Sequence, residues 1–148
     1  MTKNELPLIR GWISGVLCVA ALLCSGCSQE VETARIRGRV SLNGAPREGV
    51  EVTFWNEGQT DQFLFSTATS ADGTFEVQNI ALGDVRQCVV TFSKPALKNG
   101  KDLPTDVKSS EIDAIDLAPA ILRDPKKSPV KTTVPIDDFQ YDITSGKS

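Results

Sequence analysis

The fold class is decided by residues 35–42, RIRGRVSL, in which every second position is apolar or glycine. A period of two is typical of a β-strand with one buried face. The predicted buried face consists of Ile36, Gly38, Val40 and Leu42. The opposite face carries Arg35, Arg37 and Arg39. Asn43-Gly44 follows at once and favours a tight turn, so we predict a strand over residues 34–42 that ends in this turn.

Further segments with a strand pattern follow along the chain. They are GVEVTFW (49–55), FLFSTAT (63–69), TFEVQNI (74–80), RQCVVTF (86–92), a strand with Val130, Thr132 and Val134, and a last one with Phe139, Tyr141 and Ile143. Turn residues such as Asp72-Gly73 separate them. Short strands at this spacing predict an all-β protein, an antiparallel β-sandwich of about seven strands.

Residues 94–128 interrupt this pattern with a long stretch rich in Lys, Asp and Pro. Connections of this length are uncommon in compact domains and are usually functional or disordered. Within it, SSEIDAIDLAPAIL (109–122) matches a short helix. In that helix Ser109 or Ser110 would be the cap, Ile112 and Ile115 would face inward, and Pro119 would break it. We therefore expect one long loop insertion that contains this helix.

The first 26 residues have the anatomy of an export signal. Lys3 and Arg10 precede an apolar run over residues 11–23, which is short for a bilayer span of about 20 residues. Ser25, Gly26 and Cys27 come next and resemble the lipobox of bacterial lipoprotein signal peptides. This resemblance implies cleavage between Gly26 and Cys27 and acylation of Cys27. A plain cleaved signal and an uncleaved anchor are the alternatives.

On this interpretation the chain has four parts. They are a lipoprotein signal peptide (1–26), an acylated N-terminus and tether (27–33), one β-sandwich domain (34–144) and a frayed C-terminus (145–148). We expect the processed protein to be anchored by its lipid in the bacterial cell envelope outside the cytoplasm, in the inner or the outer membrane. Only Cys88 then remains as a free thiol, and its alternation with Val90 and Phe92 predicts a buried apolar role.

Several motifs resemble the carboxypeptidase regulatory-like, or transthyretin-like (prealbumin-like), domain of bacterial surface proteins. The matching positions are Gly38, Gly44, Pro46, Gly49, Val50, Val52, Asp72, Gly73, Phe75 and Gly83. Asp84 and Val85 stand where that family usually has a tyrosine. The tail resembles small envelope lipoproteins built on this domain, through Asp124, Pro125, Ser128 and Pro129. The resemblance implies a transthyretin-like sandwich that ends near Ile143.

The composition argues against several functions. The net charge is −3 with no basic tract, so we expect no nucleic-acid partner. The chain has no histidine, which the transthyretin-like hydrolases use, and arginines replace the lysine that forms isopeptide bonds in related sandwiches. The acid pairs Asp113 with Asp116 and Asp137 with Asp138 lack the spacing of a calcium loop. We therefore predict no catalysis, no metal and no cofactor.

Two features suggest a ligand face. Arg35, Arg37 and Arg39 would stand ~7 Å apart on one strand and repel one another unless an anion or a partner such as Glu51 or Glu76 lies beside them. Trp55 falls on the polar side of its strand, where it would stack on a sugar or be covered by residues 94–128. A simpler explanation is that the charged arginines prevent this strand from pairing with the strands of other molecules.

These observations leave three functional hypotheses. The first is a non-enzymatic envelope module with a structural role and a protein partner. The second is a module that binds a carbohydrate or another anionic ligand, such as envelope polysaccharide, with Arg35, Arg37, Arg39 and Trp55. A transthyretin-like hydrolase is a distant third, because histidine is missing.

Overall fold

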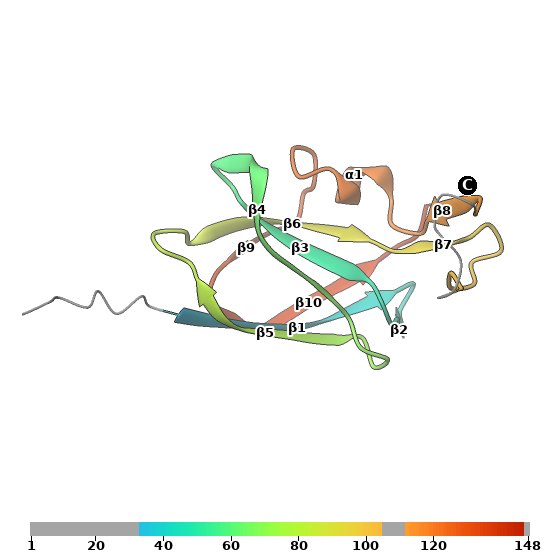
Figure 1. Cartoon of the computed structure of the whole chain (residues 1–148), viewed down its shortest axis with the longest axis horizontal. Helices are drawn as coiled ribbons and strands as arrows, with labels where there is room; N and C mark the ends of the chain where they lie inside the picture. The colour runs from blue at the N-terminus through green and yellow to red at the C-terminus, as the bar shows by residue number, and fades with distance from the viewer. Residues whose placement is uncertain (1–32, 105–111, 147–148) are drawn as a thin grey trace, which may run out of the picture. The chain divides into compact units, whose positions relative to one another are not determined.

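Two four-stranded sheets, packed face to face, make up most of the structure described by the computed structural model (Figure 1). The structure describes residues 33–104 and 112–146. Cys27, Ser109 and Ser110 lie outside the described residues, as do the predicted signal peptide and most of the tether. The prediction of an all-β sandwich is confirmed at this coarse level.

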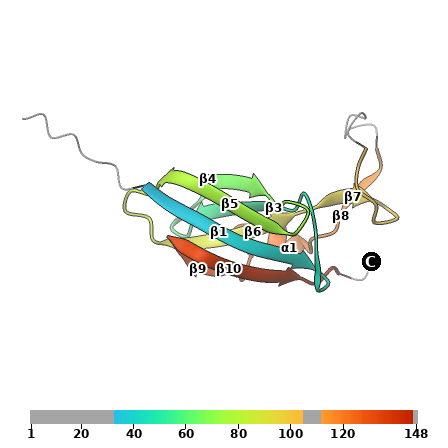
Figure 2. The same cartoon turned by 90° about the horizontal axis from the view of Figure 1, so that it is seen from below.

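The first sheet is built around β1 (Thr33–Leu42). β5 (Thr74–Ala81) and the two-residue β2 (Ala45–Pro46) pair with it in antiparallel orientation. β10 (Ile136–Ile143) pairs on the other side in parallel orientation, from Ile36↔Ile136 to Leu42↔Ile143. Figure 2 shows β10, β1 and β5 side by side. The prediction of a purely antiparallel sandwich is therefore wrong at this pair.

The second sheet is antiparallel throughout, with the strand order β4-β3-β6-β9. Its strands are β3 (Glu51–Asn56), β4 (Gln59–Ala68), β6 (Gln87–Ser93) and β9 (Lys131–Thr133). The position of β9 in this sheet explains why β10 runs parallel to β1. β9 ends opposite Gln87, at the start of β6, and only Val134-Pro135 separates it from β10. The chain thus enters β10 at the end of the sandwich where β1 also begins (Figure 1).

Apolar side chains from both sheets fill the space between them. The fully buried ones include Ile36, Val40, Val50, Val52, Phe54, Cys88, Val90, Phe92, Val134 and Ile143. Phe54 lies at the centre, stacked on Phe65 with ring centroids 4.6 Å apart. The predicted inward faces of residues 35–42 and 86–92 are confirmed, and Cys88 is buried as expected. Burial of this kind contributes roughly 1.5–3 kcal/mol for each large apolar side chain.

Residues 94–128 differ from the predicted loop with a helix. β7 (Pro95–Leu97) and β8 (Ala114–Asp116) form a two-stranded ribbon, and the short helix α1 (Ala120–Arg123) follows Pro119. The helix prediction is wrong at Ile115, because this residue pairs with Ala96 across the ribbon. Pro119 precedes a helix instead of breaking one, a position where its fixed φ fits. Among the described residues, no helix has the length and apolar character needed to cross a membrane.

Candidate functional site

The outer face of the first sheet carries the three arginines in a central row. Arg35, Arg37 and Arg39 are exposed because Ile36 and Val40 alternate with them and point into the core. The strand register places Arg37 opposite Glu76 of β5. Arg39 lies between Thr74 of β5 and Gln140 of β10. The cationic row is therefore bordered on both sides by polar strands.

Asp137 of β10 is the partner of the first two arginines. Arg35 contacts its carboxylate through Nε and Nη2, both at 3.1 Å, and Arg37 donates from Nε to its backbone oxygen at 3.3 Å. Of the two expected partners, Glu76 lies opposite Arg37 as predicted, whereas Glu51 does not lie beside the arginines. Glu76 accepts a hydrogen bond from Gln78 at 2.5 Å, and Glu51 lies in the other sheet, where it accepts one from Ser66 at 2.9 Å. The role of Asp137 as partner of the arginines could not be predicted from the sequence, because it depends on the parallel pairing of β10 with β1.

Arg37 and Arg39 line a hollow of about 410 Å³ beside β10. Its other lining residues are Gly38, Thr74, Asp137, Asp138 and Gln140. Within residues 33–104 and 112–146, the Arg39 side chain forms no hydrogen bond and no ion pair, so its donors are directed at solvent. Two guanidinium groups beside one hollow suit an anion, since charge-assisted hydrogen bonds are the strong ones.

The charge of Arg39 also acts on Asp72, in the turn before β5. The pKa of Asp72 is lowered to about 2, chiefly because the Thr74 hydroxyl donates to its carboxylate at 2.6 Å. The Ser70 hydroxyl donates at 2.8 Å, and the Thr74 N–H at 3.1 Å. Asp72 is thus engaged in holding the turn.

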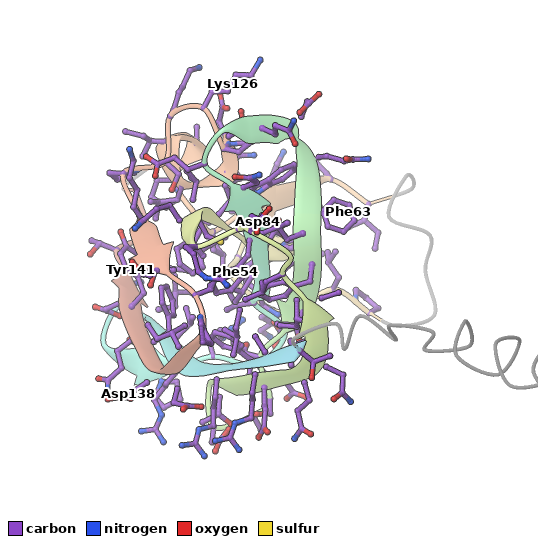
Figure 3. The ribbon with its side chains drawn as sticks, turned by 90° about the vertical axis from the view of Figure 1, so that its left-hand side faces the viewer. Phe54, Phe63, Asp84, Lys126, Asp138 and Tyr141 are labelled. Atoms are coloured by element: carbon purple, nitrogen blue, oxygen red, sulfur yellow. The ribbon has the colours of Figure 1, made fainter. Side chains whose placement is uncertain are left out.

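Trp55 lies on the outer face of the second sheet, away from the arginines. Its Nε1 donates to the Thr91 hydroxyl at 2.8 Å, and its ring meets Phe63 edge to face with centroids 6.0 Å apart. Figure 3 shows Phe63 on the outside of the sandwich and Phe54 between the sheets. The prediction that Trp55 and the arginines share one ligand face is therefore wrong, because β1 and β3 belong to different sheets.

The four acidic residues considered for metal binding are engaged elsewhere. Asp113 pairs with Lys98, Asp137 with Arg35, and Asp138 accepts a hydrogen bond from Gln140. Asp116 accepts hydrogen bonds from the Ser93 hydroxyl at 2.6 Å and from two backbone N–H groups. In the part of the chain that the structure describes, no three Asp, Glu or Cys side chains gather as a metal site would require.

An ionic cluster at the base of the β7–β8 ribbon was not predicted from the sequence. Lys94 is only 7% exposed, and its Nζ lies 2.7 Å from Asp102. Arg47 contacts the same carboxylate at 2.8 Å. The hydrogen bond from Lys94 lowers the pKa of Asp102, so the carboxylate stays ionised and unreactive.

Cys88 is unsuited to nucleophilic chemistry. Burial in the core, with a smaller contribution from Glu57, raises its pKa to about 11. The thiol is therefore protonated at neutral pH, and it is the thiolate that reacts.

A scan against protein-family models finds no match, and a search of curated proteins finds none either. The arrangement of Arg37 and Arg39 beside a polar hollow is a candidate binding site.

Proposed function

We propose that this chain is a lipid-anchored protein of the bacterial cell envelope, with no catalytic activity. Its β-sandwich binds an anionic ligand outside the cytoplasm, in the hollow beside Arg37 and Arg39. The observation that carries this function is that two exposed guanidinium groups border one hollow of about 410 Å³, while Arg39 forms no hydrogen bond or ion pair with the described side chains.

The fold within this proposal is that of a carboxypeptidase regulatory-like, transthyretin-like domain. The turn geometry supports it, since Gly73 has a φ of +77° that only glycine adopts readily. Phe75 supports it too, because it enters the core directly after this turn.

The anchor within this proposal is the acylated Cys27. The sandwich begins at Thr33, so the intervening chain spans at most about 20 Å when fully extended. The sandwich would then remain close to the membrane surface. Intact mass of the membrane fraction tests the anchor. We expect a diacylated or triacylated species that starts at Cys27 and is lost in Cys27→Ser, whereas an unlipidated product cut elsewhere would exclude it.

Binding is tested with the full chain purified in a non-ionic detergent, using polygalacturonate and its neutral methyl ester as probes. We expect the charged polymer to bind and the ester not to bind, since the guanidinium groups recognise the carboxylate. Arg37→Gln with Arg39→Gln should abolish binding. Lys126→Gln removes a positive charge on the side of the sandwich away from Asp138 and is the matched control (Figure 3). Equal binding by the double variant would exclude this site.

A structural role is the second candidate, and the β7–β8 ribbon favours it. This ribbon extends at the end of the sandwich opposite to the start of β1 (Figure 1). A module anchored through its N-terminus would present the ribbon away from the membrane. Crosslinking in cells from Lys98, which is exposed beside the ribbon, should capture one specific envelope protein if this role holds. Failure to capture any would exclude it.

A further inference from the structure

Two adjacent hollows have lining residues in common, and we call them together the track. The hollow beside β10 and a second one of about 470 Å³ both include Arg37 and Thr74. The second hollow continues past Glu76 of β5 to residues 67–70 at the end of β4. Neighbouring strands lie about 4.8 Å apart, so the path from β10 to β5 covers about 10 Å before it reaches β4. The track is thus longer than a single small anion needs.

The charges along this track follow a definite order. Arg37 and Arg39 occupy its centre, on β1. Asp138 lies on the β10 side and Glu76 on the β5 side. Each of these carboxylates accepts one hydrogen bond from a neighbouring glutamine, at 2.9 Å and 2.5 Å. A carboxylate has about four acceptor positions, so both retain the capacity to bind hydroxyl donors.

This order favours one class of ligand over others. A dense phosphate polymer has no hydroxyl donors for Asp138 and Glu76 and would be repelled by them. The buried core of a protein–protein interface is usually apolar and poor in charged residues. Phe75, the one aromatic residue that lines the track, is only 4% exposed. An acidic sugar chain fits the track, because it has an anionic group for the two arginines and hydroxyl groups on either side for the two carboxylates.

We propose that this track binds an acidic oligosaccharide across the strands. A uronate carboxylate lies over Arg37 and Arg39, and the hydroxyl groups of the flanking sugars donate to Asp138 and Glu76. This inference rests on the proposed anion-binding function and names its ligand class. It makes the site a recognition surface for several sugar units, in which the flanking acids select against bare polyanions.

The test is calorimetric titration of the full chain in detergent with galacturonate and glucuronate, their linear trimers, and tripolyphosphate. We expect each trimer that binds to do so at least tenfold more tightly than its monomer, and tripolyphosphate to bind more weakly than the trimer. Glu76→Gln and Asp138→Asn should weaken trimer binding at least threefold, whereas monomer binding should not weaken, because each variant removes a negative charge beside the arginines. Lys126→Gln should change neither. All these residues are exposed, so unchanged thermal unfolding would confirm that the variants are folded.

The outcomes separate this inference from the function on which it rests. Equal affinity for monomer and trimer, with loss of both in Arg37→Gln, would keep the anion site and overturn the track. Tighter binding of tripolyphosphate would overturn the role of the flanking acids. Binding of no uronate, or binding unaffected by Arg37→Gln, would overturn the proposed function together with this inference.

Discussion

The rings of Phe75 and Phe139 meet edge to face across Gly38, with centroids 6.1 Å apart. They come from β5 and β10, the two neighbours of β1, and each lies opposite Gly38 in the strand register. A glycine in a strand leaves space above it, and aromatic side chains from neighbouring strands can fill that space. The two strands are thereby connected through their side chains as well as through β1.

Gly38→Ala should destabilise the protein. A Cβ there would lie 2.5 Å from the backbone oxygen of Phe139 and 2.9 Å from the Phe75 ring, and the backbone cannot move aside as a side chain can. Overpacking of this kind costs roughly 1–3 kcal/mol, which lowers the unfolding midpoint by at least ~4 °C. Gly58→Ala is the control, since its nearest neighbour atom is 3.9 Å away. Equal melting of the two variants would contradict this packing.

The stability of the protein should fall between about pH 4 and pH 2. The folded-state pKa of Asp72 is about 2, against 3.8 for the free side chain, so the unfolded chain binds more protons in this window. The contribution of the Asp72 contacts to the free energy of unfolding is therefore fully present above about pH 4 and is lost as the pH falls towards 2. Hydrogen bonds also lower the pKa values of Asp102, Asp124 and Asp142, in the same sense. Urea unfolding at pH 2.5 and pH 5 measures the change, which should be smaller in Asp72→Asn. An equal loss of stability between pH 5 and pH 2.5 in the parent protein and in Asp72→Asn would count against the hydrogen bonds of Asp72 in this turn.

Cys88 should resist alkylation in the folded protein. Its thiol is fully buried, and a pKa of about 11 leaves it protonated at pH 8. Iodoacetamide treatment at pH 8 followed by peptide mass mapping should find Cys88 unmodified in buffer and fully modified in concentrated guanidinium chloride. Rapid modification in buffer would show that the core opens at this strand.

Asp102→Ala should destabilise the protein more than the loss of an ordinary surface carboxylate. It leaves the ammonium group of Lys94, only 7% exposed, without its partner at 2.7 Å. The expected cost is about 1–3 kcal/mol, because a buried donor is left unsatisfied. Adding Lys94→Met should recover most of this loss in urea unfolding. Asp113→Ala breaks the exposed pair with Lys98 and should stay within about 0.5 kcal/mol of the parent protein. Additive losses from Asp102→Ala and Lys94→Met would mean that the pair is uncoupled.

Local sequence patterns predicted the strands and turns well. The alternation in residues 35–42 predicted the buried and exposed faces of β1, and Asn43-Gly44 predicted the turn that both residues form with positive φ. Asp72-Gly73 predicted the turn before β5, in which Gly73 has a positive φ. These features depend on a few adjacent residues, whose backbone preferences and alternation are visible in the sequence.

The arrangement of the strands was predicted less well. Alternation shows which side chains share a face, but it does not show which strand lies beside another, so the sequence did not reveal β10 next to β1 or Asp137 beside Arg35. For the same reason Trp55 was grouped with arginines of the other sheet. The spacing of Ile112 and Ile115 fitted a helix, but pairing with β7 and the three hydrogen bonds of Asp116 favour a strand at 114–116.

The parallel pairing of β1 and β10 has a mechanical consequence. The chain enters β1 at one end of the sandwich and leaves β10 at the other, so tension between the two chain ends pulls these neighbouring strands in opposite directions along their length. Such a load shears the ladder from Ile36↔Ile136 to Leu42↔Ile143, and its hydrogen bonds resist together instead of opening one after another. A protein held at its N-terminus and pulled at its C-terminus would thus bear force through the β1–β10 pair.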